Sequence, residues 1–376
     1  MSTPRAPCTS WYYVIDAAGP DHAKVAPFGN VLKLGSFKHR VYLLHATKLI
    51  GSYDSESYLV PEGYKKALFL HRFGELVRYQ RVFLQHGVTY NDVTSGAGQR
   101  VASYDLLVTA GRQERDFMAL EAGYGDRAQP VGFPRFDALQ RERRDKPRIL
   151  LMPTWRQWIV TASYKKSAGP ARTSFTQSEY YRFYKALLSD PRLGRALDHF
   201  GVDLEFFPHY EIRPYLHTFQ FSSPSIQVAD PHTRNVQQAM KECSLMVTDY
   251  SSVFFDVAYM GIPLVYVPFD EEDFYGRHYK RGYFDLAEDG FGPVCRTVDQ
   301  AVDEIIAAIA RDFTVQPEHR ARVEEFFVHR GGGNCERVFD AIDALGTASA
   351  AELAPPGPVG ALPAPRPADP EWVGAA

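Results

Sequence analysis

The chain is poor in cysteine and lacks the short motifs of several common enzyme classes. Its 376 residues include four cysteines, which are scattered and form no Cys-x-x-Cys pair. This usage favours a reducing compartment with free, mostly buried thiols over a disulfide framework. There is no Walker-type glycine loop, no Gly-x-Ser-x-Gly elbow, no strict Asp-x-Asp pair and no His/Cys cluster with metal-ligand spacing. We therefore expect no metal and no resident cofactor.

Long apolar runs and excess charge of one sign are also missing. The first eight residues have no apolar run of a secretory signal, and the most apolar stretch, Ser244–Asp270, contains Asp249 and Asp256. The net charge of −3 gives no basic field for nucleic acid. We expect a cytoplasmic protein with no membrane span and no nucleic-acid partner. A peripheral contact with the inner face of the cell membrane stays open, because it needs only a local patch.

Apolar runs of strand length alternate with helical patterns along the chain. The length suits two domains, and 45% of the residues are hydrophobic. Strands are predicted at residues 41–44, 81–85, 104–109, 149–152, 203–208 and 225–229, and helices at 112–122, 177–189, 191–200, 235–243, 298–312 and 319–329. The alternation predicts an α/β fold with two doubly wound sheets facing each other across a cleft.

Composition also suggests the domain boundaries. The charged stretch 141–148 is either an interdomain crossing or a solvated helix end. We place an N-terminal Rossmann-like domain at 1–145 and a C-terminal Rossmann-like domain at 146–345. Residues 346–376 are rich in Ala, Pro and Gly, cannot bury enough apolar surface to fold alone, and are expected to be disordered.

The segment Ser244–Asp270 reads as buried strand, polar turn, helix, glycine stop and second buried strand. Its turn places Thr248, Asp249, Ser251 and Ser252 at the carboxyl end of a strand and the start of a helix. Ligands of open α/β sheets bind at such strand ends, and a helix N-terminus favours an anion such as phosphate. The turn therefore predicts a phosphate-binding site.

A simpler interpretation of the turn is helix capping. Ser251 or Ser252 is a natural N-cap, and both hydroxyls could do no more than cap the helix. Asp256, four residues after Ser252, would then support the cap or contact the ligand.

Two histidines directly follow strong apolar strands. His86 is followed by Gly87, which lets the backbone turn sharply and leaves room for a ligand. His209 follows Pro208, and Arg213 lies four residues further on. Imidazole can accept a hydroxyl proton near neutral pH, and arginine can bind phosphate through two hydrogen bonds. The alternative for each histidine is a structural bond to a backbone carbonyl, and other histidines such as His278 are expected to be surface or packing residues.

Polar residues also follow the strand at 149–152. Thr154 and Arg156 are candidate ligand contacts, although a structural turn with an ion pair would explain them equally well. The acidic run Asp270–Asp273 is expected to be a solvated loop and not a metal site.

Taken together, these motifs resemble the CDP-glycerol glycerophosphotransferase family, which includes teichoic acid primases and polymerases and related capsule polymerases. The block Thr248–Asp256 is the most specific match. The resemblance covers roughly residues 80–330, and the remaining matching motifs occur in the family's order: Gln85–Gly87, Gly132–Asp137, Pro153–Arg156, Pro208–His209, Gly261–Pro263, Phe269–Asp270 and Arg281–Asp285.

The resemblance implies a GT-B-like fold with two Rossmann-type domains and the active site in the cleft between them. It implies that the N-terminal domain, 1–145, lies on the acceptor side and that the C-terminal domain, 146–345, binds the CDP donor. It implies an enzyme that transfers glycerol phosphate, or a related polyol phosphate, from a CDP-activated donor to a glycan or lipid-linked acceptor hydroxyl and releases CMP. The family's two essential histidines fall on His86 and His209, and its donor-binding positions on Arg213 and the turn Thr248–Ser252. Family members often have His-Pro where this chain has His209-Tyr210, so Arg213 matches less well than His209.

Two other functions fit part of the pattern. A GT-B glycosyltransferase using a sugar nucleotide would share the fold and the phosphate-binding turn. A non-catalytic subunit of a capsule assembly would show no turnover, but would not need both histidines together with the hydroxyl cluster. The donor that supports turnover discriminates among the three.

Overall fold

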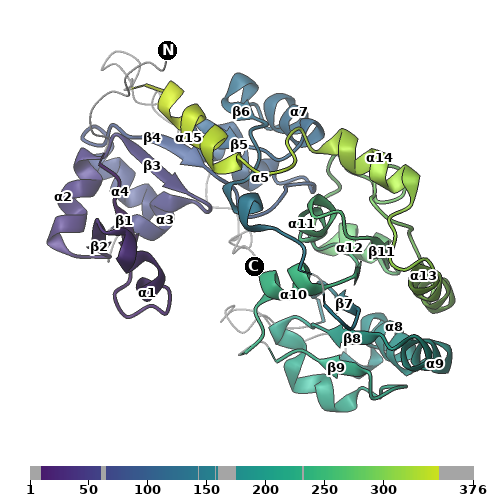
Figure 1. Cartoon of the computed structure of the whole chain (residues 1–376). Coiled ribbons are helices and arrows are strands. Elements are labelled where there is room, and N and C mark those ends of the chain that lie inside the picture. Colours follow the sequence, from purple (N-terminus) through teal and green to yellow (C-terminus); the bar gives the residue numbers. More distant parts are fainter. Residues whose placement is uncertain are drawn as a thin grey trace. The chain divides into compact units, whose positions relative to one another are not determined.

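The computed structural model describes residues 10–60, 65–142, 144–156, 158–159, 175–230 and 233–346, except for the side chains of residues 210, 211, 213 and 214. Figure 1 shows its elements. The chain forms two compact units. Unit 1 comprises residues up to 86, 102–107 and 342 onward, and unit 2 comprises 87–101 and 108–341. The domain boundary at 145/146 stays a prediction, and the tail beyond residue 346 lies outside the described residues.

Unit 1 is built on short parallel strands. β1 (Tyr13–Ile15) pairs with β2 (Val31–Lys33), and β4 (Gln80–Phe83) lies between β3 (Lys48–Gly51) and β5 (Leu106–Val108). The last described residues return to this sheet, since Lys48 Nζ donates to the Gly346 carbonyl at 2.7 Å. The helices of unit 1 are α1 (His22–Val25), η1 (Ala26–Phe28), α2 (Phe37–His45), α3 (Ser55–Leu59) and α4 (Lys66–Phe73).

A buried carboxylate joins α3 to β4 within unit 1. Glu56 accepts hydrogen bonds from Tyr79 Oη at 2.7 Å and Arg81 Nε at 3.0 Å, and Lys66 Nζ lies 3.0 Å away. Burial alone would raise the pKa of Glu56, but the bonds and charges of Arg81, Tyr79 and Lys66 outweigh it and lower this pKa below its ordinary 4.5.

This carboxylate predicts acid sensitivity of unit 1. A carboxyl group with a depressed folded-state pKa stabilises the fold above its unfolded pKa, and that stability is lost as the pH falls through the folded value. We expect amide protection in β3 and β4 to fall below about pH 4.5, and to fall less in a Glu56→Gln variant. Hydrogen exchange corrected for intrinsic rates measures this, with the exposed Glu75→Gln as control. Equal pH slopes in wild type and Glu56→Gln would contradict the prediction.

Unit 2 holds a five-stranded parallel sheet in the order β11-β10-β7-β8-β9. The strands are β7 (Arg148–Met152), β8 (Asp203–Phe206), β9 (Ile226–Val228), β10 (Leu245–Thr248) and β11 (Leu264–Tyr266). The first strand in sequence, β7, is central. The chain adds β8 and β9 on one side, then crosses to add β10 and β11 on the other, as in one half of a Rossmann fold.

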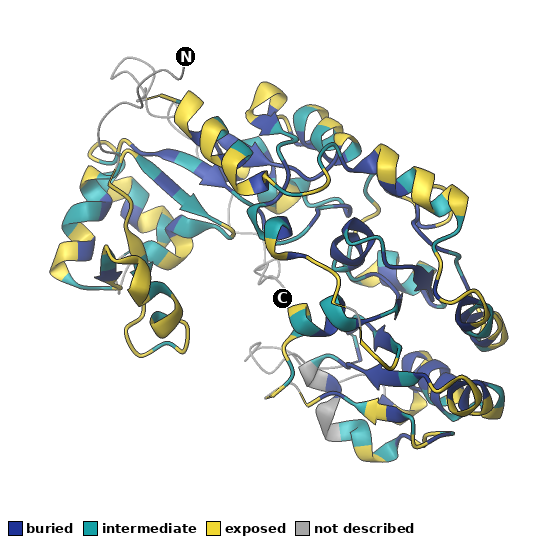
Figure 2. Ribbon diagram, viewed as in Figure 1, coloured by how far each residue is buried: buried dark blue, intermediate teal, exposed yellow. Residues whose placement is uncertain are grey.

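Both faces of this sheet are covered, so its strands are nearly continuous apolar runs. Alternate strand residues such as Ile149 and Val247 pack with α8 (Glu179–Ser189), α9 (Pro191–Phe200) and α13 (Val298–Ala310). α11 (Phe254–Tyr259) contacts β10 and β11, and all six of its residues are buried (Figure 2).

The other elements that begin in unit 2 lie outside this five-stranded sheet. They are α5 (Thr94–Ala97), α6 (Gln99–Ala102), α7 (Arg112–Leu120), η2 (Gly125–Arg127), β6 (Ala128–Gln129), η3 (Pro134–Ala138), η4 (Phe175–Gln177), η5 (Tyr210–Thr218), α10 (Val236–Glu242), α12 (Glu271–Arg277), α14 (Pro317–Phe326) and α15 (Asn334–Ala344). Of these, β6 is the fourth strand in the order β3-β4-β5-β6.

The predicted α/β class is confirmed, and one predicted strand is wrong. Residues 41–44 lie in α2, which begins after Ser36, where the serine side chain accepts a hydrogen bond from the His39 amide. A run of four apolar residues does not distinguish a strand from a buried helix turn, and the N-cap decides here. The predicted free thiols are confirmed for Cys243, Cys295 and Cys335. Burial raises the pKa of the first two to about 12, so these thiols stay protonated.

Candidate active site

The strand order of unit 2 fixes where a ligand would bind. The chain reverses direction across the sheet between β7 and β10, whose residues Met152 and Thr248 are in register. In open α/β sheets the crevice beyond the carboxyl ends of two such strands is the usual ligand site. The loop after β7 carries Thr154 and Arg156, and the turn after β10 carries Ser251 and Ser252. The structure thus brings two separately predicted segments to one edge of the sheet.

Hydrogen bonds tie the loop after β7 to the turn after β10. Thr248 Oγ1 donates to the Met152 carbonyl at 2.7 Å. The Asp249 carboxylate accepts from the backbone amides of Thr154 at 2.8 Å and Tyr250 at 2.7 Å. Thr248 and Asp249 are both fully buried. Their polar atoms therefore hold the two segments together. Direct contact of either residue with the CDP-activated donor stays a prediction.

Arg156 lies at the centre of a buried ionic cluster. Its guanidinium donates to both Asp270 oxygens, at 2.7 and 2.8 Å, and its Nη2 lies 2.9 Å from Asp249 Oδ2. Tyr250 Oη adds a bond to Asp270 at 3.2 Å, and Tyr184 Oη adds one to Asp249 at 3.1 Å.

The charge of Arg156 is secured by these partners. Burial by itself would lower its pKa, but Asp249 and Asp270 outweigh burial and raise the pKa well above its ordinary value. The guanidinium also packs near the rings of Tyr180 and Tyr250, 5.3 and 4.9 Å from their centroids. Arg156 is fully buried, so its ion pairs stabilise the loop after β7 from within the protein. This matches the alternative that the loop is a structural turn with an ion pair. The predicted donor contact of Arg156 remains untested.

Asp270 corrects an expectation from the sequence. The acidic run Asp270–Asp273 was expected to be a solvated loop, but Asp270 is 8% exposed and paired with Arg156, while the next residues begin α12. The run of acidic residues in the sequence does not show that Asp270 pairs with Arg156. The signal was the Phe269–Asp270 match to the family motif.

The two serines of the turn do not cap α11. The N-cap position is Val253, no side chain caps the helix, and the hydroxyls of Ser251 and Ser252 have no hydrogen-bond partner within the described part of the chain. Their carbonyls accept from the amides of Phe254 and Phe255, each at 3.2 Å, in a tight first turn. The expectation of a serine N-cap is therefore wrong, and the hydroxyls are not used up by capping.

The same turn has unused backbone donors. The amides of Ser251, Ser252 and Val253 donate to no other described residue. Successive amides of this kind form the concave anion site of many phosphate-binding turns. Thr154 Oγ1, in the neighbouring loop, is buried and also has no partner among the described residues. The edge of the sheet therefore combines amide and hydroxyl donors, as a phosphate group requires.

Asp256 does not support a helix cap. Its carboxylate is paired with Arg135, whose Nε and Nη2 donate at 2.9 and 2.7 Å. This pair joins η3 to α11. In the same η3 segment as Arg135, Asp137 accepts hydrogen bonds from the backbone amide and the side chain of the buried Asn334. The expected support of a cap is therefore wrong, because the partner of Asp256 lies in a distant motif, and its contact with a ligand stays a prediction.

His209 lies at the same edge of unit 2. It follows β8, is half-buried, and stacks on Trp155 with ring centroids 5.6 Å apart and an interplanar angle of 23°. Trp155 directly follows Thr154, so the histidine predicted from β8 and the loop after β7 are in contact. His278 meets the same indole edge-on at 5.2 Å, in the packing role expected for it.

Arg213 belongs to η5, and its side chain lies outside the described residues. Its predicted donor contact is therefore a matter for experiment.

His86 belongs to unit 1, beyond β4. The preceding residue, Gln85, has a left-handed backbone with φ of 58°, which turns the chain at the strand end. The ring stacks on Tyr53 at 4.6 Å and 9°, and Nδ1 lies 3.3 Å from the Ser52 carbonyl. A carbonyl can only accept, so this bond needs a proton on Nδ1. In the neutral ring Nε2 is then the basic nitrogen, as a general base requires.

The described residues contain neither a membrane-spanning helix nor a group of metal-binding side chains. None of the helices in the described ranges combines the length and apolar character needed to span a bilayer. In the same part of the chain, no three His, Cys, Asp or Glu side chains are grouped to hold a metal ion.

Comparison with known proteins places these features in a family. The sequence model for CDP-glycerol:poly(glycerophosphate) glycerophosphotransferase matches residues 5–344. The minor teichoic acid biosynthesis protein GgaB of Bacillus subtilis (strain 168) is 28% identical over 335 residues, which are 88% of this chain and 36% of that protein. The chain thus spans about a third of this relative's length.

Solved structures show the fold. The wall teichoic acid polymerase TagF, soaked with CDPG, matches with a TM-score of 0.56 and 18% identity over 89% of this chain and 80% of that chain. A protein described as a UDP-N-acetylglucosamine 2-epimerase, from Listeria monocytogenes, matches with a TM-score of 0.52 and 11% identity over 84% and 83%. These likenesses confirm the predicted GT-B-like, Rossmann-type fold.

Proposed function

Since the chain belongs to the CDP-glycerol:poly(glycerophosphate) glycerophosphotransferase family, we propose that it transfers glycerol phosphate, or a related polyol phosphate, from a CDP-activated donor to an acceptor hydroxyl. CMP is the second product. The observation that carries the proposal is the turn Thr248–Ser252 at the switch point of the sheet. Its unused hydroxyl and amide donors suit the pyrophosphate of such a donor.

The reaction needs positioning and charge stabilisation more than covalent catalysis. The acceptor oxygen attacks the β-phosphorus, a new P–O bond forms, and the bond to CMP breaks. His86, with Nε2 as its basic nitrogen, takes the acceptor proton. His209 and Arg213 stabilise the charge that builds on the pyrophosphate, while Ser251 and Ser252 hold its oxygens.

The wider role follows from the same family. We propose that the acceptor is a glycan or lipid-linked chain and that the product is a cell-surface polymer of the teichoic acid or capsule type. A lipid-linked acceptor would bring the protein to the inner face of the cell membrane as a peripheral protein.

Donor choice tests the proposal. Purified protein is incubated with CDP-glycerol, CDP-ribitol or a UDP-sugar, together with a membrane-derived acceptor, and nucleotide release is followed with mass spectrometry of the products. Release of CMP with polyol phosphate added to the acceptor supports the proposal. Turnover of the UDP-sugar alone would identify a glycosyltransferase instead, and no turnover of any donor would favour a non-catalytic subunit.

A glycine beside the turn tests the role of Ser252. A Cβ at Gly87 would lie 2.9 Å from Ser252 Oγ, so Gly87→Ala must rotate this hydroxyl. We expect the KM for CDP-glycerol to rise about tenfold, the size of one lost hydrogen bond to a charged group. The free energy of unfolding should change by less than about 1 kcal/mol.

A double-mutant cycle supplies the control. Without the Ser252 hydroxyl, the added methyl group has nothing to displace, so Gly87→Ala/Ser252→Ala should behave like Ser252→Ala alone. Fully additive effects on KM would show that the methyl group acts elsewhere.

A further inference from the structure

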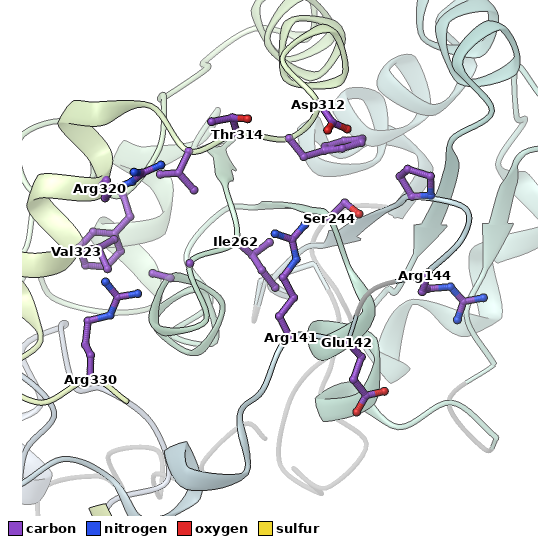
Figure 3. A pocket seen from close by; sticks show the side chains of 16 residues that line it. Arg141, Glu142, Arg144, Ser244, Ile262, Asp312, Thr314, Arg320, Val323 and Arg330 are labelled. Atoms are coloured by element: carbon purple, nitrogen blue, oxygen red, sulfur yellow. The ribbon is translucent and has the colours of Figure 1, made fainter. Parts of the chain in front are cut away.

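A cavity of about 510 Å³ opens in unit 2 away from the candidate active site (Figure 3). Pro147 and Ser244 line it, and they directly precede β7 and β10, while Ile262 lies just before β11. Because these strands are parallel, their amino ends meet at one edge of the sheet. The candidate active site lies at the carboxyl ends, so the cavity occupies the opposite edge.

The charged lining is mainly cationic. Four arginines and two carboxylates face the cavity. Arg144 is paired with Glu242 at 2.7 Å, and Glu142 is paired with Lys241 at 2.6 Å. Three lining arginines form no ion pair with any described carboxylate: Arg141, Arg320 and Arg330. The remaining lining carboxylate is the exposed Asp312.

These three arginines come from separate segments. Arg141 precedes β7, Arg320 lies on α14, and Arg330 follows α14 and donates to the Tyr259 carbonyl at 3.3 Å. Figure 3 shows them spread around the cavity and not stacked at one point. The separation favours a ligand with several spaced negative charges over a single small anion.

Apolar side chains contribute less of the cavity surface than polar groups do. Ile262, Phe291 and Val323 line it, together with Phe313 from the turn after α13. Asp312 and Phe313 both have left-handed backbones, with φ of 50° and 53°. This conformation is costly for non-glycine residues and persists only where the surrounding structure enforces it. These apolar lining side chains are almost fully buried, so the arginines supply most of the groups that a ligand would contact.

We propose that this cavity is an accessory site for the phosphodiester chain of the polymer that the enzyme extends. The proposal rests on the proposed function. A polyol phosphate chain carries its anionic phosphates at intervals, which matches arginines that reach the cavity from separate segments. Holding the chain here keeps the polymer on the enzyme between additions.

Direct binding tests the site without turnover. A fluorescent, chemically made glycerol phosphate oligomer is titrated with the full chain, and anisotropy gives its affinity. Arg141→Ala/Arg320→Ala should weaken binding by about tenfold or more, the size of one to two charge-assisted hydrogen bonds. Arg195→Ala, an exposed arginine of α9 outside the cavity, should leave the affinity unchanged. Inorganic phosphate and CMP should compete poorly, because each carries its charge at one point.

The activity readout separates this site from the active site. With a short acceptor, CMP release by the double variant should equal that of wild type, but products from a long acceptor should become shorter. An oligomer affinity that does not depend on the two arginines, or equal competition by inorganic phosphate or CMP, overturns the accessory site. If the wild type releases no CMP, the proposed function is wrong. The oligomer affinity alone then decides whether the accessory site exists.

Discussion

Replacing Arg156 by methionine is expected to destabilise unit 2 by about 3–5 kcal/mol, the loss typical when one partner of a buried ion pair is removed. Methionine keeps much of the volume but leaves Asp249 and Asp270 buried without their cation. Urea unfolding followed by tryptophan fluorescence measures the loss, because Trp155 adjoins the cluster. The same variant should lose CMP release in proportion to its unfolded fraction.

Charge-neutral variants show whether the loss comes from unpaired charge. Arg156→Met/Asp249→Asn/Asp270→Asn removes all three charges and should regain much of the stability. Arg192→Met removes a partly exposed guanidinium that pairs with Asp190, Asp299 and Asp303 at the surface of α9 and α13, and it should change the unfolding midpoint less than Arg156→Met does. A loss below about 1 kcal/mol for Arg156→Met would contradict a structural role for the cluster.

The second large effect is expected on catalysis and not on stability. His86→Ala and His209→Ala should each lower CMP release by about 10²–10⁴-fold, the usual contribution of a general acid or base. Both rings are partly exposed, so the free energy of unfolding should change little. His278→Ala is the matched control, because it removes another imidazole from the ring of Trp155 with no proposed part in the chemistry.

The pH profile distinguishes the two histidines. The general base must be unprotonated, so kcat/KM should fall on the acid side, and only the variant that lacks the base should lose that dependence in its residual activity. We expect this of His86→Ala. Loss of the acid limb in His209→Ala alone would exchange the two roles, and near-wild-type CMP release by either variant would remove that residue from the mechanism.

The sequence predicted the parallel α/β architecture because its signal is local. Buried strands of a parallel sheet are continuous apolar runs, and β7, β8 and β10 each end in polar residues. Strand ends in such a sheet share one edge, so the pattern alone places His209 near Thr154. Residues 41–44 of α2 were predicted as a strand, because four consecutive apolar residues show neither the helical nor the strand periodicity.

The roles of individual polar residues were harder to predict, because they depend on partners far away in the chain. Arg156 and Asp270 are 114 residues apart, and Arg135 and Asp256 are 121 apart. A charge pattern shows that such residues are present, but not which of them meet. The alternative that the serines only cap α11 is wrong, because the tight first turn moves the N-cap to Val253 and leaves both hydroxyls unused.

The sequence by itself determined the fold class, the family and the strand ends from which the candidate residues come, because hydrophobic periodicity and short motifs are local properties. Only the tertiary structure decided that Arg156, Thr248 and Asp249 support the site from within and that Ser251 and Ser252 have unused donors. It alone assembled the arginine-lined cavity at the opposite edge of the sheet. Burial and pairing set these outcomes, and both depend on contacts between segments that are distant in sequence.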